Sequence, residues 1–372
     1  MKIIPFETER LLSQWQNEVE YELSDSGVYP IHLKELVSRE EYDKLYDDIQ
    51  LRYIQTNGPL PLKEAICPLY EDIHPDNLLV TNASTEANFL ATWHFIEPKD
   101  EIATFVPTYL QVPTLVKMFG GSVKEVYLQE KNDWAPDLDE LEAAVTEKTK
   151  FIYLANPNNP TGAILSEDEM DRIVKIAARY GTWIIADEVY RGAELSGPFT
   201  PSFWGKYDRL LAVGSLSKGF TSPGLRLGWV AGPKEKIKEL WSYHDFTTIT
   251  TNAISARMAI LALQPDCRQK ISKRLVRIAT EQLQNLNTWV SKHSDVLQMV
   301  QPKIGGVSFV KYDLDISSMD LVMRLKDEQS VLIVPGEAMG MDGFVRIGYG
   351  HPKLLTGLER IADTLLSIKN GN

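Results

Sequence analysis

A lysine in a short serine-rich segment is the residue of this sequence with the clearest potential for covalent chemistry. Lys218 lies in Ser215-Leu216-Ser217-Lys218-Gly219-Phe220, and Arg226 follows it closely. An amine in such a turn can form a Schiff base with an aldehyde cofactor, while hydroxyls and a guanidinium nearby can hold a phosphate of that cofactor. Most lysines are solvated surface charges, so the assignment depends on the motifs that accompany this one.

Two further motifs precede the lysine, and each follows an apolar run typical of a buried strand. They are Asn156-Pro157-Asn158-Asn159-Pro160-Thr161-Gly162 and Asp187-Glu188-Val189-Tyr190. Asp187 comes directly after Trp183-Ile184-Ile185-Ala186, which would place its carboxylate at a dry strand end. There it would stabilise a cation, such as the protonated ring nitrogen of a bound cofactor, by Coulomb attraction that water screens little. A helix cap or a surface aspartate is the alternative.

In this order, the motifs resemble those of fold-type I pyridoxal-phosphate (PLP) enzymes of the class I and II aminotransferase group, and the resemblance covers essentially all 372 residues. It implies an α/β fold, in which a large doubly wound domain with a mostly parallel sheet is joined to a small α+β domain. The expected divisions are an N-terminal arm over residues 1–49 that joins the small domain, a PLP-binding domain over 50–275, and a small domain over 276–372. Pyridoxal 5'-phosphate is the implied cofactor.

The same resemblance assigns site residues position by position. It implies that Lys218, Asp187 and Tyr190 are catalytic and also bind the cofactor. The other residues expected to bind the cofactor are Ser84, Thr85, Tyr109, Asn159, Ser215, Ser217, Arg226 and Tyr53. The substrate, an amino acid, is expected to contact Gly27, Asn159 and Arg346. Tyr53 matches a tyrosine that reaches the phosphate from the neighbouring subunit, so a homodimer with shared sites is expected. The family usually has glycine where this chain has Ala83.

The alternation of short apolar runs with amphipathic stretches places these motifs on the loops of an open α/β sheet. Strands are predicted over 77–81, 101–105, 151–154, 182–186, 210–214 and 227–231, and then over 305–310, 331–334 and 344–347. A helix is predicted to begin at Ser166, with Glu169 completing a capping box, and to end at Gly181. Helical patterns also run from Pro233 to about Leu263 and from Arg268 to Ser291. Ligands bind at the carboxyl ends of the strands in such sheets, where the motifs lie.

Composition excludes several classes of protein. The net charge of -12, with 51 acidic and 39 basic residues, disfavours nucleic acid and anionic membranes as partners. It also argues against a transcription regulator on this fold, which would need a basic N-terminal DNA-binding module. Cys67 and Cys267 have no metal-ligand spacing, so no metal site is indicated. The sequence has no apolar run of membrane-spanning length and no secretory signal, so a cytoplasmic location is expected.

The reaction is not determined by these motifs, because transamination, elimination, racemisation and cyclisation share the same first steps. The stretch Glu20–Tyr29 resembles cyclases of the capreomycidine-synthase type. This favours dehydrating cyclisation of a hydroxylated L-arginine to a cyclic guanidine amino acid of the enduracididine or capreomycidine type. Glu9 and Asp25 would then bind the guanidinium, although solvated carboxylates are an equal alternative. Related arginine oxidases have Gly-His where this chain has Val28-Tyr29, which disfavours oxygen chemistry. The alternative reaction is that of an amino-acid:2-oxo-acid aminotransferase.

Overall fold

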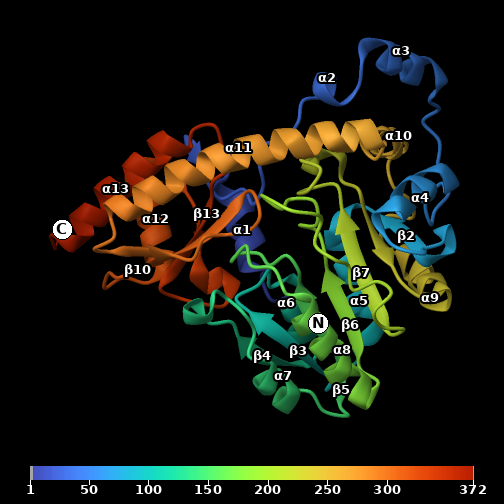
Figure 1. The fold of residues 1–372 in the computed structure, drawn as a ribbon, viewed down its shortest axis with the longest axis horizontal. Helices are drawn as coiled ribbons and strands as arrows, with labels where there is room; N and C mark the ends of the chain where they lie inside the picture. Colours follow the sequence, from blue (N-terminus) through green and yellow to red (C-terminus); the bar gives the residue numbers. More distant parts are fainter. Residues whose placement is uncertain (1–2, 372) are drawn as a thin grey trace.

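A seven-stranded sheet forms the centre of the larger part of the protein, in a computed structural model that describes residues 3–371 (Figure 1). The strand order is β2-β8-β7-β6-β5-β3-β4. Neighbouring strands are parallel except at β8, which is antiparallel to both β2 and β7. The strands are β2 (Leu78–Thr81), β3 (Glu101–Val106), β4 (Ser122–Tyr127), β5 (Thr149–Ala155), β6 (Trp183–Asp187), β7 (Leu210–Ser215) and β8 (Gly228–Ala231). The predicted α/β class and mostly parallel sheet are confirmed.

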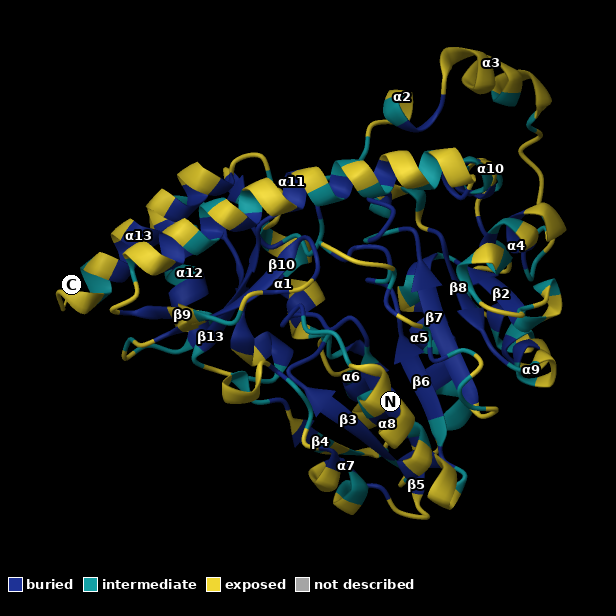
Figure 2. Cartoon of the chain, in the orientation of Figure 1, coloured by how far each residue is buried: buried dark blue, intermediate teal, exposed yellow. Residues whose placement is uncertain are grey.

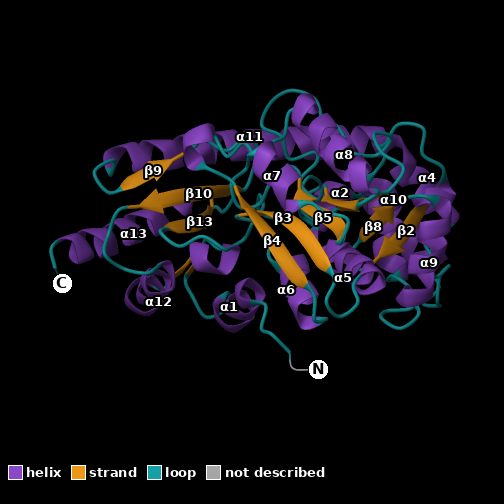
Figure 3. Ribbon diagram, turned by 90° about the horizontal axis from the view of Figure 1, so that it is seen from below, coloured by secondary structure: helices purple, strands orange, loops and turns teal. Residues whose placement is uncertain are grey.

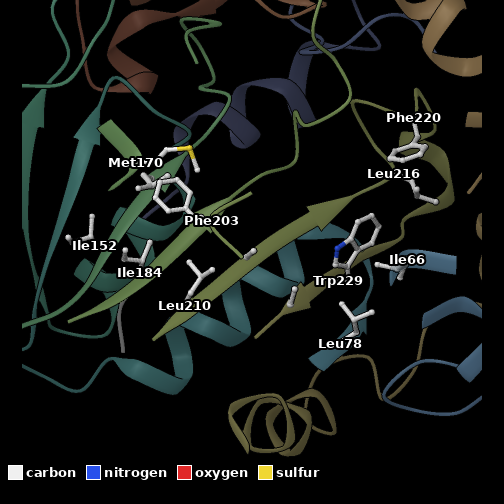
Figure 4. Close-up of a cluster of buried hydrophobic side chains, with 14 of the residues drawn as sticks. Ile66, Leu78, Ile152, Met170, Ile184, Phe203, Leu210, Leu216, Phe220 and Trp229 are labelled. Atoms are coloured by element: carbon white, nitrogen blue, oxygen red, sulfur yellow. The ribbon is translucent and has the colours of Figure 1, made fainter. Parts of the chain in front are cut away.

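Burial on both faces explains why the central strands are nearly continuous apolar runs. Figure 4 shows part of the core on one face, where Ile152 and Ile184 of neighbouring strands pack with Met170 and Phe203. All four side chains are fully buried. The edge strand β4 was not predicted, because Ser122-Val123-Lys124-Glu125 is mostly polar. Charged residues are typical of an edge, where they oppose pairing with another chain.

Helices cover both faces of this sheet (Figure 3). They are α4 (Leu60–Ile66), α5 (Ala83–Phe95), α6 (Gln111–Met118), α7 (Leu138–Ala144), α8 (Glu167–Tyr180), α9 (Lys234–His244) and α10 (Ala253–Ala262), with short 3-10 turns η1 (Cys67–Leu69), η2 (Pro75–Asn77), η3 (Glu130–Asn132) and η4 (Pro223–Leu225). The prediction for α8 is confirmed, since Ser166 and Glu169 form the capping box and Gly181 ends the helix with a φ of +65°.

The stretch predicted as one helical pattern from Pro233 to Leu263 is instead broken between α9 and α10. The intervening loop, residues 245–252, contains Thr247, Thr248, Thr250 and Thr251. Threonine has a low helix propensity, and its hydroxyl competes for hydrogen bonds with the helix. Here the hydroxyls of Thr247 and Thr248 both bond to Glu86 on α5, at 2.5 and 2.7 Å. Tertiary contacts therefore end the helix.

The smaller part is an α+β unit that the long helix α11 (Pro265–Lys292) connects to the larger one (Figure 1). Its antiparallel sheet has the order β12-β13-β10-β9. These strands are β9 (Leu297–Met299), β10 (Val307–Tyr312), β12 (Val334–Pro335) and β13 (Phe344–Gly348), and they pack with α12 (Ser318–Gln329), η5 (Gly336–Met339) and α13 (Leu354–Lys369). The predicted strands over 305–310 and 344–347 are present.

The N-terminal segment folds back onto this smaller unit. β1 (Tyr21–Glu22) pairs in parallel with β11 (Val331–Leu332), and α1 (Glu7–Trp15) contacts η5. Farther along, α2 (Leu33–Leu36) lies beside the start of α11, and α3 (Arg39–Asp48) has no buried residue and stands away from the body (Figure 2). The domain boundaries at 49 and 275 stay a prediction. No helix among residues 3–371 is long and apolar enough to cross a membrane.

Candidate active site

The strand directions bring the carboxyl ends of β2, β3, β5, β6 and β7 to one edge of the sheet, and a cavity of about 590 Å³ opens there. Most of the residues predicted from the sequence lie in its wall. They are Glu9, Asp25, Ser84, Thr85, Tyr109, Asn159, Asp187, Tyr190, Ser217, Lys218, Arg226 and Arg346. Ser215, Gly27 and Tyr53 are not in that wall, although Ser215 and Gly27 touch residues that are.

Lys218 enters the cavity from the loop after β7. A side chain at Gly219 would meet the Arg191 carbonyl at 2.3 Å, so this turn packs directly against the segment that follows Asp187. The Lys218 Nζ lies 3.4 Å from Asp25 Oδ1 on the N-terminal arm. Lys218 therefore extends from a closely packed loop, and its amine faces the carboxylate of Asp25.

Asp187 ends β6 and is 8% exposed. Its Oδ2 accepts hydrogen bonds from Asn88 Nδ2 at 2.8 Å and from the Tyr153 hydroxyl at 3.4 Å, and its Oδ1 accepts the Val189 amide at 3.2 Å. Burial raises the pKa of Asp187, and these neutral donors offset only part of that effect. A cation beside this carboxylate would stabilise its charged form, which is what a protonated pyridine nitrogen supplies.

Phosphate-binding groups gather where β2 runs into α5. Ser84 and Thr85 lie in the first turn of that helix, where backbone amides lack helical partners. Ser215 Oγ lies 2.8 Å from Ser217 Oγ, so the two hydroxyls form one group. Arg226 is exposed toward the same cavity. Amides at a helix start, hydroxyls and a guanidinium together suit a phosphate dianion.

The turn before these amides contains a strained residue. Ala83 has a φ of +66°, a left-handed conformation that costs an alanine about 1–2 kcal/mol. The position that the family usually fills with glycine therefore keeps the left-handed backbone although its residue is alanine. Gly228 of β8 lies directly behind it, and a side chain there would come within 2.6 Å of the Ala83 and Ser84 backbone.

Arg346 projects from β13 and is almost fully buried. Its Nη1 donates to Asn159 Oδ1 at 3.1 Å and its Nη2 donates to the Ser24 carbonyl at 2.6 Å. Within residues 3–371, its Nε has no hydrogen-bond partner. A buried guanidinium that meets no carboxylate among the described residues suits an anionic ligand, and the α-carboxylate of an amino acid is one.

The N-terminal arm touches the same site through its backbone. The Tyr190 hydroxyl donates to the Ser26 carbonyl at 2.6 Å, and burial raises the pKa of Tyr190. A side chain at Gly27 would lie 3.4 Å from Lys218 Cδ. The segment Ser24–Gly27 therefore contacts Arg346, Lys218 and Tyr190 in succession.

Glu9 contacts Tyr109, a partner that the sequence did not indicate. Its Oε1 accepts the Tyr109 hydroxyl at 2.8 Å, and Phe6 packs edge-on against the Tyr109 ring at 4.8 Å. Burial raises the pKa of Tyr109 well above its ordinary value, and the Glu9 charge adds to the effect. Helix α1 thus holds the ring predicted to stack on the cofactor.

Tyr53 is the predicted residue that this chain alone does not bring to the site. Its side chain is 81% exposed, and it lies outside the cavity wall. Leu51, two positions earlier, is exposed to a similar degree. Its contact with the phosphate of a neighbouring subunit stays a prediction.

Two residues that hold the Asp187 carboxylate were missed from the sequence. Asn88 and Tyr153 both bond to Asp187, and both are buried. Asn88 is polar among Ala87, Leu90 and Ala91 on the buried side of α5, and that break in the apolar face is the signal that could have identified it. Tyr153 lies inside an apolar strand, where nothing distinguishes it from a core aromatic residue.

The residues present fit pyridoxal 5'-phosphate on chemical grounds. One cavity contains a phosphate-binding group, a buried carboxylate, an aromatic ring and an amine. The carboxylate has no cationic partner among the described residues. These groups match the phosphate, the ring nitrogen, the ring face and the aldehyde of that cofactor.

Comparison with known proteins leads to the same cofactor. Residues 26–361 match the family described as aminotransferase class I and II. The chain is 26% identical to an aspartate aminotransferase of Thermotoga maritima, over 88% of this chain and 87% of the relative. It is also 26% identical to a capreomycidine synthase of Streptomyces vinaceus, over 95% and 93%. A crystal structure of a PLP-dependent aminotransferase from Streptococcus suis superposes with a TM-score of 0.92 at 33% identity, covering 99% of each chain. The chain therefore belongs to the class I and II aminotransferase family, has the fold of its PLP-dependent members, and uses pyridoxal phosphate as its cofactor.

Proposed function

We propose that the protein transfers the amino group of an L-amino acid to a 2-oxo acid. The observation that carries this proposal is the convergence of Lys218, Asp187 and Arg346 on one cavity. Lys218 supplies the amine that the reaction requires, Asp187 suits the nitrogen of the cofactor ring, and Arg346 suits the carboxylate of the substrate. Aminotransferases predominate among the relatives, which supports transamination over the cyclisation that the N-terminal sequence favoured.

Each group has a defined task in this proposal. PLP supplies an electron sink for the pair left on Cα when its proton is removed. Arg346 would bind the substrate carboxylate, with Gly27 closing over it. The Lys218 amine would remove the proton from Cα of the amino acid and, in the second half of the reaction, would deliver a proton to Cα of the 2-oxo acid that receives the amino group. Asp187, held by Asn88, keeps the pyridine nitrogen protonated.

The remaining residues position the cofactor. Ser84, Thr85, Ser215, Ser217 and Arg226 bind its phosphate. Tyr109 covers one face of the ring, and Asn159 hydrogen-bonds the phenolic oxygen. Tyr190 would donate to the same oxygen when its hydroxyl, which donates to the Ser26 carbonyl in this structure, turns toward the cofactor. Because the Asn159 carbonyl oxygen already accepts from Arg346, the NH₂ group of that side chain is left to donate.

A homodimer with shared sites is part of the proposal. Tyr53 would bind the phosphate of the neighbouring subunit, and its 81% exposure in the single chain supports a role outside its own cavity.

A second candidate reaction is favoured by the acidic side of the cavity. Glu9, Glu22 and Asp25 all line it, and Asp25 already lies 3.4 Å from an ammonium group. Such a lining suits a cationic side chain, as in dehydrating cyclisation of a hydroxylated arginine. In that reaction water leaves Cγ and a guanidine nitrogen bonds to the same carbon. The likeness to a capreomycidine synthase supports this candidate as well.

One experiment separates the two reactions. The purified holoenzyme is incubated with L-aspartate, L-arginine or γ-hydroxyarginine, with and without 2-oxoglutarate, and the products are identified by mass spectrometry. Transamination predicts more than one product molecule per active site only when the 2-oxo acid is present. A product of γ-hydroxyarginine that has lost water and forms without any 2-oxo acid would replace it with cyclisation.

A further inference from the structure

A buried carboxylate outside the catalytic set lies behind the phosphate-binding turn. Glu86 is one helical turn into α5 and is 9% exposed. Its Oε2 accepts the Asn82 backbone amide at 2.6 Å, so the side chain reaches back to the residue that precedes the strained Ala83. The amides of Ser84 and Thr85 are left to the ligand as a result.

The other side of this carboxylate is occupied by the loop between α9 and α10. Its Oε1 accepts the hydroxyls of Thr247 and Thr248 at 2.5 and 2.7 Å, and His244 Nε2 lies 3.4 Å from its Oε2. Thr248 Oγ1 in turn accepts Asn82 Nδ2 at 2.7 Å. Asn82 is therefore tied to Glu86 by its backbone and to Thr248 by its side chain.

Ala83 needs such support because an alanine leaves the left-handed region readily when nothing holds it there. Its carbonyl accepts the Thr81 hydroxyl at 2.9 Å, which fixes one side of the turn. The contacts of Asn82 fix the other side. Strain of this kind persists only where the surrounding structure determines the conformation.

We propose that Glu86, His244, Thr247 and Thr248, together called the Glu86 cluster, are positioning residues that hold Ala83 in its left-handed conformation and so keep the phosphate-binding turn in shape. The inference rests on the phosphate site assigned under Proposed function. It gives the loop between α9 and α10 a role in cofactor binding, although this loop supplies no residue to the cavity wall.

Thr248→Val tests the cluster without changing any charge near the phosphate. It removes the hydroxyl that joins Glu86 to Asn82. The control is Thr251→Val in the same loop, because it is the same substitution and the Thr251 hydroxyl has no hydrogen-bond partner in the described chain. Thr251 is buried whereas Thr248 is exposed, so the control removes a hydroxyl from the more closely packed of the two positions. Each variant is measured for its affinity for pyridoxal 5'-phosphate and for pyridoxal, which lacks the phosphate. Hydrogen exchange of residues 82–86 is followed in the apo-protein.

The expected result is a three- to tenfold loss of affinity for pyridoxal phosphate in Thr248→Val, as for one or two ordinary hydrogen bonds, with pyridoxal affinity unchanged. Exchange at residues 82–86 should quicken in Thr248→Val and not in Thr251→Val. Glycine tolerates a positive φ, so in an Ala83→Gly background the Thr248→Val substitution should change cofactor affinity less than twofold.

Two results would overturn the proposal: equal losses in Thr248→Val and Thr251→Val, or a loss that persists at full size with Gly at position 83. Equal losses for the two aldehydes would overturn it if exchange at residues 82–86 is also unchanged. Unchanged exchange and unchanged affinity in Thr248→Val would overturn it as well. Faster exchange at residues 82–86 without any change in preference for the phosphorylated cofactor would still support the role of the Glu86 cluster in holding Ala83. It would show instead that the phosphate site assigned under Proposed function is wrong.

Discussion

Replacing Asp25 with asparagine should selectively weaken the binding of a cationic substrate. Asp25 Oδ1 already lies 3.4 Å from one cation, the Lys218 ammonium. At that distance two unit charges attract by about 1 kcal/mol in water and about 5 kcal/mol at an effective dielectric constant of 20. Because the Asp25 side chain is 40% exposed, the lower figure applies. The expected loss is therefore about 1 kcal/mol, or roughly fivefold in affinity.

The assay compares L-arginine with L-citrulline, which has nearly the same shape but no charge on its side chain. Binding of each to the holoenzyme is followed by the change in the absorbance of the cofactor. Asp25→Asn should raise the Kd of arginine about fivefold and leave that of citrulline within twofold. Glu20→Gln is the control, since Glu20 is an exposed carboxylate of the same arm outside the cavity wall. If arginine and citrulline weaken by equal factors, or arginine does not weaken, Asp25 does not bind a cationic side chain.

Four further predictions concern the cofactor, the subunits and stability. Borohydride reduction and peptide mapping should place the cofactor on Lys218, and Lys218→Ala should lose the visible absorbance band; a label on another lysine would refute this. Asp187→Asn should retain cofactor yet lower kcat by ~10³-fold or more, and a near-normal kcat would remove Asp187 from the site. Mixing inactive Lys218→Ala and Tyr53→Ala proteins should restore partial activity through hybrid dimers, whereas an active strict monomer in sedimentation would contradict shared sites. Although burial alone raises the pKa of Glu86, its hydrogen bonds lower it to about 2 from an ordinary 4.5. Its contribution of about 2–3 kcal/mol is therefore present above pH 4.5 and is lost as the pH falls toward 2. In denaturant unfolding of the apo-protein, the gap between wild type and Glu86→Gln should close over that range, and a gap independent of pH would exclude the effect.

The parts of the fold that could be predicted are those with a strong local signal. The central strands are short apolar runs between turn residues, and α8 has both its capping box and its terminal glycine in the sequence. The edge strand β4 and the break between α9 and α10 lacked such a signal. The first is too polar, and the second depends on bonds from Thr247 and Thr248 to a helix far away in the chain.

In the site, too, the residues that could be predicted are those with a local sequence signal. Residues such as Lys218 and Asp187 could be found because they lie in motifs at strand ends. The contact of Glu9 with Tyr109 and the bond from Tyr190 to the Ser26 carbonyl could not, because each joins segments about 100 or more residues apart. Backbone carbonyls in particular carry no sequence signature, so the involvement of Ser24 and Ser26 is visible only in three dimensions.

The pairing of the chain's first elements with its last ones has a consequence for biosynthesis. Thr8 bonds to the Ala338 carbonyl, β1 adds to β11, and the Ser24 carbonyl accepts Arg346 from the last strand. These N-terminal residues are made before their partners, from which they are separated by 330 residues for the Thr8 bond and 322 for the Ser24 bond. The large sheet has no such delay, since every one of its strands precedes α9. During synthesis, the large sheet can therefore form while the cavity is still open, and the arm should dock only after β11, η5 and β13 have been made.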